Sequence, residues 1–203
     1  DQDQVVAQAA LTPVAREAEV DQPQRGVAEE HPDKPRSGHH QRDAGQQGDT
    51  RGVIADAGAY VCLMHMQGNP QSMQANPQYL NIVADVKSFL QQRLEAAQAA
   101  GISLNRLIID PGFGFGKTVQ HNFALLNHID SFTDLGVPVL AGLSRKSMLG
   151  AITGNTVDHR INESIAAALL AVIKGARIVR VHDVKASKDA LAIYMAMQNY
   201  QAC

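Results

Sequence analysis

The stretch Arg106-Leu-Ile-Ile-Asp-Pro-Gly-Phe-Gly-Phe-Gly-Lys-Thr118 joins an apolar run, a carboxylate and a glycine-rich loop. Its aliphatic residues 107–109 are typical of a parallel strand that is covered on both faces. Asp110 therefore lies at the carboxyl end of this strand, and Pro111 ends its hydrogen-bond ladder. The three glycines allow a tight turn or a close approach of the backbone to a ligand. Strand, glycine loop and helix in this order predict a ligand site in an α/β protein.

Two common phosphate-binding motifs do not fit the loop. A Walker loop has the form Gly-x-x-x-x-Gly-Lys-Ser/Thr, and Pro111 stands where its first glycine belongs. The dinucleotide fingerprint fails because Lys117 stands at the position of its third glycine. A purely structural role for the glycines stays open at this point.

Composition narrows the class of protein. The 203 residues are 45% hydrophobic and carry a net charge of -2, which fits one soluble domain with a sizeable core and gives no basic excess for nucleic acid. The sequence has neither the long apolar run of a membrane span nor the layout of a signal peptide, so we expect no membrane and a cytoplasmic location. Only Cys62 and Cys203 are present, and a disulfide framework is not expected.

Residues 1–51 differ from the rest of the chain. Only six of the first fifty residues are Leu, Ile, Val or Phe, too few to build a core. Histidines 31, 39 and 40 lack the spacing of a metal site, and we expect no metal ligands in this chain. We expect this segment to be disordered, or to have been read out of frame in a truncated gene.

From residue 52 onward, apolar runs alternate with helical patterns. Expected strands cover residues 59–64, 107–110, 139–143 and 177–181, and expected helices follow at about 82–97, 121–132, 159–174 and 188–198. In the third helix we expect the buried stripe Ile161, Ile165, Ala168, Leu169 and Val172. Four strand-loop-helix units predict a parallel sheet or barrel with right-handed crossovers.

Polar residues cluster where these strands end: Met64 and His65, Asp110, Ser144 and Lys146, Arg180 and His182. In a (β/α) barrel this rim is where ligands bind. Asp110 can accept paired N–H donors from a flat heterocycle, and Lys146 can donate to a ring nitrogen or carbonyl. Arg180 and His182 suit a phosphate or diphosphate, and Phe115 can pack on the ring. The expected ligand is an anion with a polar flat ring.

Four motifs resemble the second half of the dihydropteroate synthase family, in the same order and at similar spacing: Met64-His-Met-Gln-Gly-Asn-Pro70, Asp110-Pro-Gly-Phe-Gly-Phe-Gly-Lys117, Gly142-Leu-Ser-Arg-Lys-Ser147 and Arg180-Val-His-Asp183. The resemblance implies a (β/α)8 TIM barrel, here with only the last four βα units. It also implies a transferase of folate biosynthesis that joins p-aminobenzoate to a dihydropterin methyl diphosphate. The expected domains are residues 1–51, a partial pterin-binding barrel at 52–198, and a tail at 199–203.

Binding roles follow from the same resemblance. Asp110 and Lys146 would hold the pterin, in a slot formed by Met64, Gly114, Phe115 and Gly142. Ser144 would lie toward p-aminobenzoate, and Arg180 and His182 would bind the diphosphate. No residue is assigned as catalytic with certainty.

The chain also departs from the family. The upstream strands, with their metal-binding Asn and mobile loops, have no match in residues 1–50, so the Mg²⁺ that the family uses lacks its protein ligand and activity is expected to be impaired or absent. The resemblance further implies a possible homodimer. Two alternatives remain open: a non-catalytic module that binds pterin or pairs with another barrel half, and a pterin-dependent methyltransferase.

Overall fold

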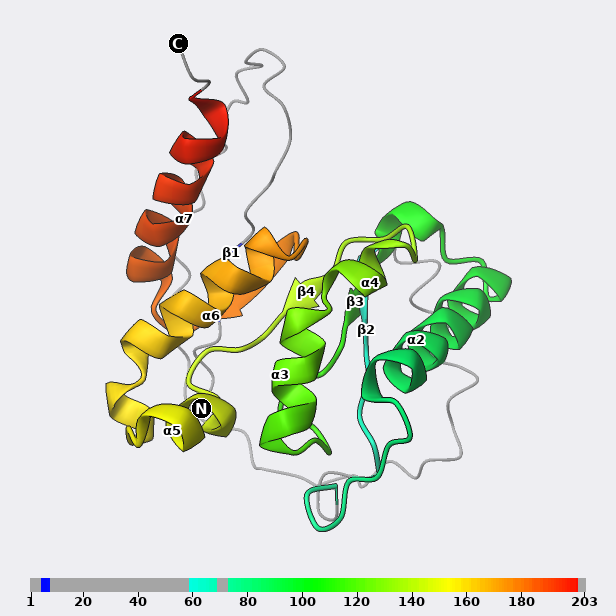
Figure 1. Ribbon diagram of the computed structural model, residues 1–203. Coiled ribbons are helices and arrows are strands. Elements are labelled where there is room, and N and C mark those ends of the chain that lie inside the picture. Colours follow the sequence, from blue (N-terminus) through cyan, green and yellow to red (C-terminus); the bar gives the residue numbers. More distant parts are fainter. Residues whose placement is uncertain (1–4, 8–58, 69–72, 201–203) are drawn as a thin grey trace, which may run out of the picture.

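The computed structural model describes residues 5–7, 59–68 and 73–200 (Figure 1). Four parallel strands follow one another in chain order: β2 (Val61–Met64), β3 (Leu107–Asp110), β4 (Leu140–Ala141) and β5 (Ile178–Val181). A parallel bridge between Ile109 and Val139 joins β3 to the start of β4. The arrangement agrees with the expected parallel sheet, and it brings the carboxyl ends of all four strands to one edge.

A further strand, β1 (Val5–Ala7), pairs antiparallel with the other edge of β5. It is the described part of the segment 1–51. The other residues of that segment lie outside the described residues. The same holds for residues 53–57, where the sequence also predicts the end of a helix, and for residues 201–203.

Each parallel strand is followed by helix: α2 (Ile82–Ala99), α3 (Val119–Asn127), α4 (Asp130–Thr133), α5 (Ser147–Thr153), α6 (Ile161–Ile173) and α7 (Val184–Asn199), with short 3-10 turns at Leu104–Arg106 and Val157–His159. Side chains fix several of the helix starts. Asn81 accepts hydrogen bonds from the amides of Val83 and Ala84 at the start of α2, and Thr118 forms a capping box with His121 at the start of α3. Contacts of α2 with α3, of α3 with α6 and of α6 with α7 place the helices in one layer beside the sheet (Figure 1).

Three expectations about these elements were wrong in detail. The helix expected at 121–132 is two helices, because His128 leaves the helical region at φ -118° and ψ 31°. The strand expected at 139–143 is only two residues long, with a bridge at Val139, because the ladder ends at Ala141 and the chain turns at residues 144–145 before α5. Helix α6 buries Ser164, Ala167, Ala168, Ala171 and Val172 and leaves Ile161 40% exposed, since its small residues allow close packing on β5 and α7.

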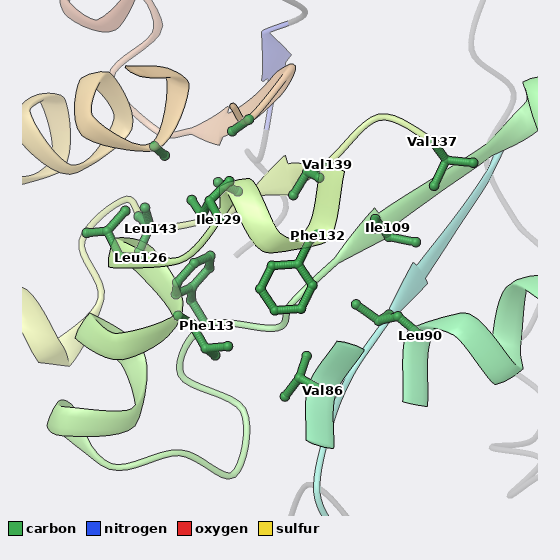
Figure 2. Packing of buried hydrophobic residues seen from close by; sticks show 14 of the residues in the cluster. Val86, Leu90, Ile109, Phe113, Leu126, Ile129, Phe132, Val137, Val139 and Leu143 are labelled. Atoms are coloured by element: carbon green, nitrogen blue, oxygen red, sulfur yellow. The ribbon is translucent and has the colours of Figure 1, made fainter. Parts of the chain in front are cut away.

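The main core fills the space between α2, α3, α4 and the sheet. Phe132 of α4 is fully buried, and it lies with Val86 and Leu90 of α2 and Ile109 of β3 in one cluster (Figure 2). A smaller cluster joins α6, β5 and α7 through Ala168, Val172, Val179, Val181 and Leu191. Among the described helices, none has both the length and the apolar character that a membrane span requires.

Replacing Phe132 by alanine is expected to lower the free energy of unfolding by about 3 to 5 kcal/mol, because it removes a buried ring and leaves a cavity. Ile193→Ala is the matched control, since this side chain is 74% exposed and its truncation is expected to change stability by about 0.5 kcal/mol or less. Urea unfolding followed by circular dichroism measures both. Equal effects of the two changes would show that the core is not centred on Phe132.

Candidate functional site

A cavity of about 260 Å³ lies at the carboxyl edge of the sheet. Its lining comes from all four strand ends: Met64, Phe115, Gly142, Ser144, Lys146, Arg180, Val181 and His182. The structure thus brings together seven of the nine residues that the sequence singles out. Asp110 and Gly114 are not part of the lining and lie next to it.

Asp110 is a buried carboxyl group at the end of β3, with 1% of the residue exposed. The amide of Gly112 donates to its Oδ1 at 2.7 Å, and Nη2 of Arg180 lies 3.6 Å from its Oδ2. Burial raises the pKa of Asp110, whereas the Gly112 amide and the cations of Arg180, Lys146 and Lys117 act in the opposite direction. The carboxyl group is therefore held in a fixed orientation between the glycine loop and β5.

Lys146 lies against the glycine loop at the cavity. Its Nζ is 4.2 Å from the centre of the Phe115 ring, a cation–π contact. Burial and the nearby Arg180 lower the pKa of Lys146, and Asp110 raises it. A β-carbon on Gly114 would stand 3.2 Å from the Lys146 side chain, so this glycine leaves room for the lysine stem.

Another corner of the cavity is formed by Ser144 and His182. Ser144 Oγ accepts a hydrogen bond from the His182 amide at 3.2 Å and lies 2.9 Å from His182 Nδ1. Gly142 has a steric role beside them, because a β-carbon there would stand 2.7 Å from Nη2 of Arg180. The geometry therefore places Ser144 against the cationic corner rather than apart from it.

Arg145 and Asp183 belong to the quoted motifs, but the sequence analysis assigned them no role. In the structure they connect the loop after β4 to the loop after β5. Arg145 donates to both carboxylate oxygens of Asp183, at 2.9 and 3.2 Å. Arg145 has φ 57°, a left-handed conformation that is uncommon for a residue with a side chain. Each of the two is adjacent in sequence to a predicted site residue, and this adjacency is the signal that could have found them.

No three His, Cys, Asp or Glu side chains come together in a possible metal site within residues 59–68 and 73–200.

A pH effect is expected from His65, whose ring is buried and packs edge-on against Phe89 at 4.9 Å. Burial and the nearby Lys117 lower the pKa of His65 to about 4. Between pH 6.5 and 4 the unfolded chain binds a proton that the folded chain does not, so stability falls as the pH falls. The contribution of His65 to this slope approaches about 1.4 kcal/mol per pH unit.

Urea unfolding at pH 4.5, 5.5 and 6.5 measures this contribution. His65→Asn is expected to flatten the slope, because asparagine keeps an acceptor near Lys117 and does not titrate. The control is His159→Asn at an exposed position. An unchanged slope in His65→Asn would show that the ring takes up its proton equally in the folded and unfolded chains.

A second expectation concerns the glycine loop. Gly112 and Gly101 both have positive φ, at 73° and 86°, but a β-carbon would meet the His65 carbonyl oxygen at 1.9 Å only at Gly112. Gly101→Ala is expected to cost about 1 to 2 kcal/mol in stability for the left-handed backbone. Gly112→Ala is expected to cost at least about 2 kcal/mol more, because the loop after β2 must move. Thermal unfolding measures the loss of stability in both variants. Equal losses would show that a β-carbon at residue 112 does not meet the His65 carbonyl oxygen.

Comparison with known proteins places this site in a family. A profile described as "Pterin binding enzyme" matches residues 41–182, starting before the boundary expected at residue 52. The dihydropteroate synthase of Haemophilus influenzae is 57% identical over 139 residues, covering 68% of this chain and 50% of that protein. The chain spans about half the length of the curated relatives it matches.

Comparison with solved structures points to the same family. Dihydropteroate synthase from Stenotrophomonas maltophilia is 52% identical with a TM-score of 0.74, over 77% of this chain and 60% of that one. The Xanthomonas albilineans enzyme in complex with 7,8-dihydropteroate is 45% identical with a TM-score of 0.71, over 77% and 57% of the two chains. These similarities identify the fold as an α/β fold of the TIM-barrel type. The chain therefore belongs to the pterin-binding enzyme family, and the relatives named here are dihydropteroate synthases.

Proposed function

We propose that the chain carries the pterin and diphosphate half of a dihydropteroate synthase, a transferase that condenses p-aminobenzoate with a dihydropterin methyl diphosphate. The observation that carries the proposal is the buried Asp110 carboxyl beside a cavity lined by Lys146, Arg180 and His182. The relative in complex with 7,8-dihydropteroate supports the choice of ligand, because that compound is the product of the condensation.

The pterin ring would bind between Asp110 and Lys146. A carboxylate accepts two parallel N–H bonds from an amino-pyrimidine edge, and the Lys146 ammonium donates to a ring nitrogen or carbonyl oxygen. Met64 and Phe115 would cover the faces of the ring, with Gly114 and Gly142 leaving the space that it needs. Asp110 would present its carboxyl group with little further ordering, because Gly112 and Arg180 already orient it.

The diphosphate would bind at Arg180 and His182. Loss of diphosphate leaves negative charge on the departing oxygens, and fixed N–H donors stabilise that charge most when they are placed beforehand. Ser144 contacts His182 and lies at the same corner, so we place the p-aminobenzoate nitrogen near Ser144, where it can attack the methylene carbon as the diphosphate departs. As the family resemblance implies, a bound Mg²⁺ would add positive charge beside the departing diphosphate.

We also propose that residues 52–198 form the last four βα units of the barrel and turn over slowly on their own. Among the described residues, only Ser144 is assigned to p-aminobenzoate, and orientation of a second substrate supplies several kcal/mol of catalysis. A homodimer and a cytoplasmic location remain predictions.

Calorimetric titration with a dihydropterin methyl diphosphate, followed by a diphosphate-release assay with p-aminobenzoate and Mg²⁺, tests the proposal. Binding with weak or no release of diphosphate is the expected result. Release at a rate near that of an intact synthase would contradict the expected impairment. Methyl transfer without diphosphate release would favour a methyltransferase, and absence of binding would remove the proposal.

Removing the Lys146 ammonium is expected to weaken pterin binding by about 1 to 3 kcal/mol, because its partner on the ring is left unpaired in a partly closed pocket. Lys146→Ala is compared by calorimetry with Lys185→Ala, whose side chain is 88% exposed on α7. The control should bind as tightly as the unmodified chain. Unchanged affinity in Lys146→Ala would give this lysine a purely structural role.

A further inference from the structure

Lys117 is a buried lysine that lines no part of the cavity, with 4% of the residue exposed. Its Nζ lies 2.9 Å from the Gly112 carbonyl oxygen, 3.0 Å from the Phe115 carbonyl oxygen and 2.9 Å from His65 Nδ1. An ammonium group has three N–H donors, and here each donor has an acceptor. His65 can accept at Nδ1 when its ring proton is on Nε2.

These three acceptors belong to two loops of the site. Gly112 and Phe115 are part of the glycine loop after β3, in which Gly112, Gly114 and Gly116 all have positive φ. A backbone of this kind has few side chains to hold it, so bonds to its carbonyl groups fix its path. His65 follows β2 and packs on Phe89 of α2. Lys117 therefore joins the glycine loop to the loop after β2.

Other contacts hold the main chain of the glycine loop at Gly114 and Gly116. Asn122 Oδ1 accepts the Gly114 amide at 2.7 Å, and the Tyr79 hydroxyl donates to the Gly116 carbonyl at 2.7 Å. Lys117 holds the loop at two other points, the main-chain carbonyl groups of Gly112 and Phe115. Because the Phe115 ring contacts the Lys146 ammonium, a shift of this main chain would move two of the surfaces that face the cavity.

Charged groups of both signs lie near Lys117 and act on its pKa in opposite directions. Burial lowers the pKa of Lys117 to about 7, Lys146 acts in the same direction, and Asp110 opposes both. The neutral His65 ring faces it from the loop after β2. The three acceptors favour the protonated amine, which alone has three N–H donors.

We propose that Lys117 is a positioning residue for pterin binding: it fixes the glycine loop so that the Phe115 ring and the Lys146 ammonium stand in place for the ring of the substrate. This inference rests on the proposed function. It predicts that loss of Lys117 affects the pterin and leaves the diphosphate corner at Arg180 and His182 unchanged.

The test compares Lys117→Met, which keeps the length of the side chain and removes its donors, with the exposed control Lys185→Met in the full chain. Hydrogen exchange of the amides at 112–116, measured without ligand, should become about tenfold faster only in Lys117→Met. Calorimetry should show dihydropterin methyl alcohol, which lacks the diphosphate, binding about tenfold more weakly, and inorganic diphosphate binding as before.

Unchanged loop exchange would overturn the proposal, as would equal weakening of both ligands, which indicates a general loss of structure. If Lys117→Met does not fold, Lys117→Gln keeps two N–H donors and should show the same pattern with smaller changes. An unmodified chain that binds neither ligand would remove the proposed function, and the hydrogen-exchange comparison would still decide whether Lys117 fixes the loop.

Discussion

The buried carboxyl group of Asp110 is the constraint on which the site depends. Placing a carboxylate where 1% of the residue is exposed costs several kcal/mol of hydration unless donors replace the water. Here the donor is the Gly112 amide, with the Arg180 guanidinium near the second oxygen. Gly112 reaches that position only with a positive φ and without a side chain, and Arg180 reaches it only because Gly142 has no β-carbon. One glycine of each motif, Gly112 and Gly142, is thus linked to the same buried carboxyl group.

The loops around the cavity are coupled in pairs by charged groups. Lys117 joins the loops after β2 and β3, Arg180 of β5 reaches Asp110 at the end of β3, and Arg145 joins the loop after β4 to Asp183 after β5. These contacts order the loops before a ligand binds. Without them, the loops would have to lose conformational freedom on binding, which would lower the affinity. The apolar core beneath them needs no such groups and is built from aliphatic and aromatic residues of α2, α3, α4 and the sheet.

Much of the candidate site could be predicted from the sequence, because the end of a strand can be recognised in a short stretch of residues. An apolar run that stops at Asp110, and a run that ends at Arg180 and His182, identify both the strand and the end of it at which the cavity lies. The register that pairs Met64 with Asp110 and the bridge at Ile109 depend on packing of the whole sheet and appear only in the structure. The predicted stripe of α6 was confirmed at Ala168 and Val172 and wrong at Ile161, because close packing selected Ser164 and Ala171 instead. Lys117 gave no signal because a lysine in sequence does not show whether it is buried.

We propose that one site, at the carboxyl ends of the four parallel strands, binds the pterin diphosphate. The most direct measurement is a titration of ¹⁵N-labelled chain with a dihydropterin methyl diphosphate, followed by amide chemical shifts. The structure predicts that the largest shifts occur at residues 112–116, 142–146 and 180–182. A second cavity lies at the opposite edge of the sheet, lined by residues that include Gly136, Val139 and Gly175. Shifts centred on that cavity, with none at the strand ends, would contradict the claim.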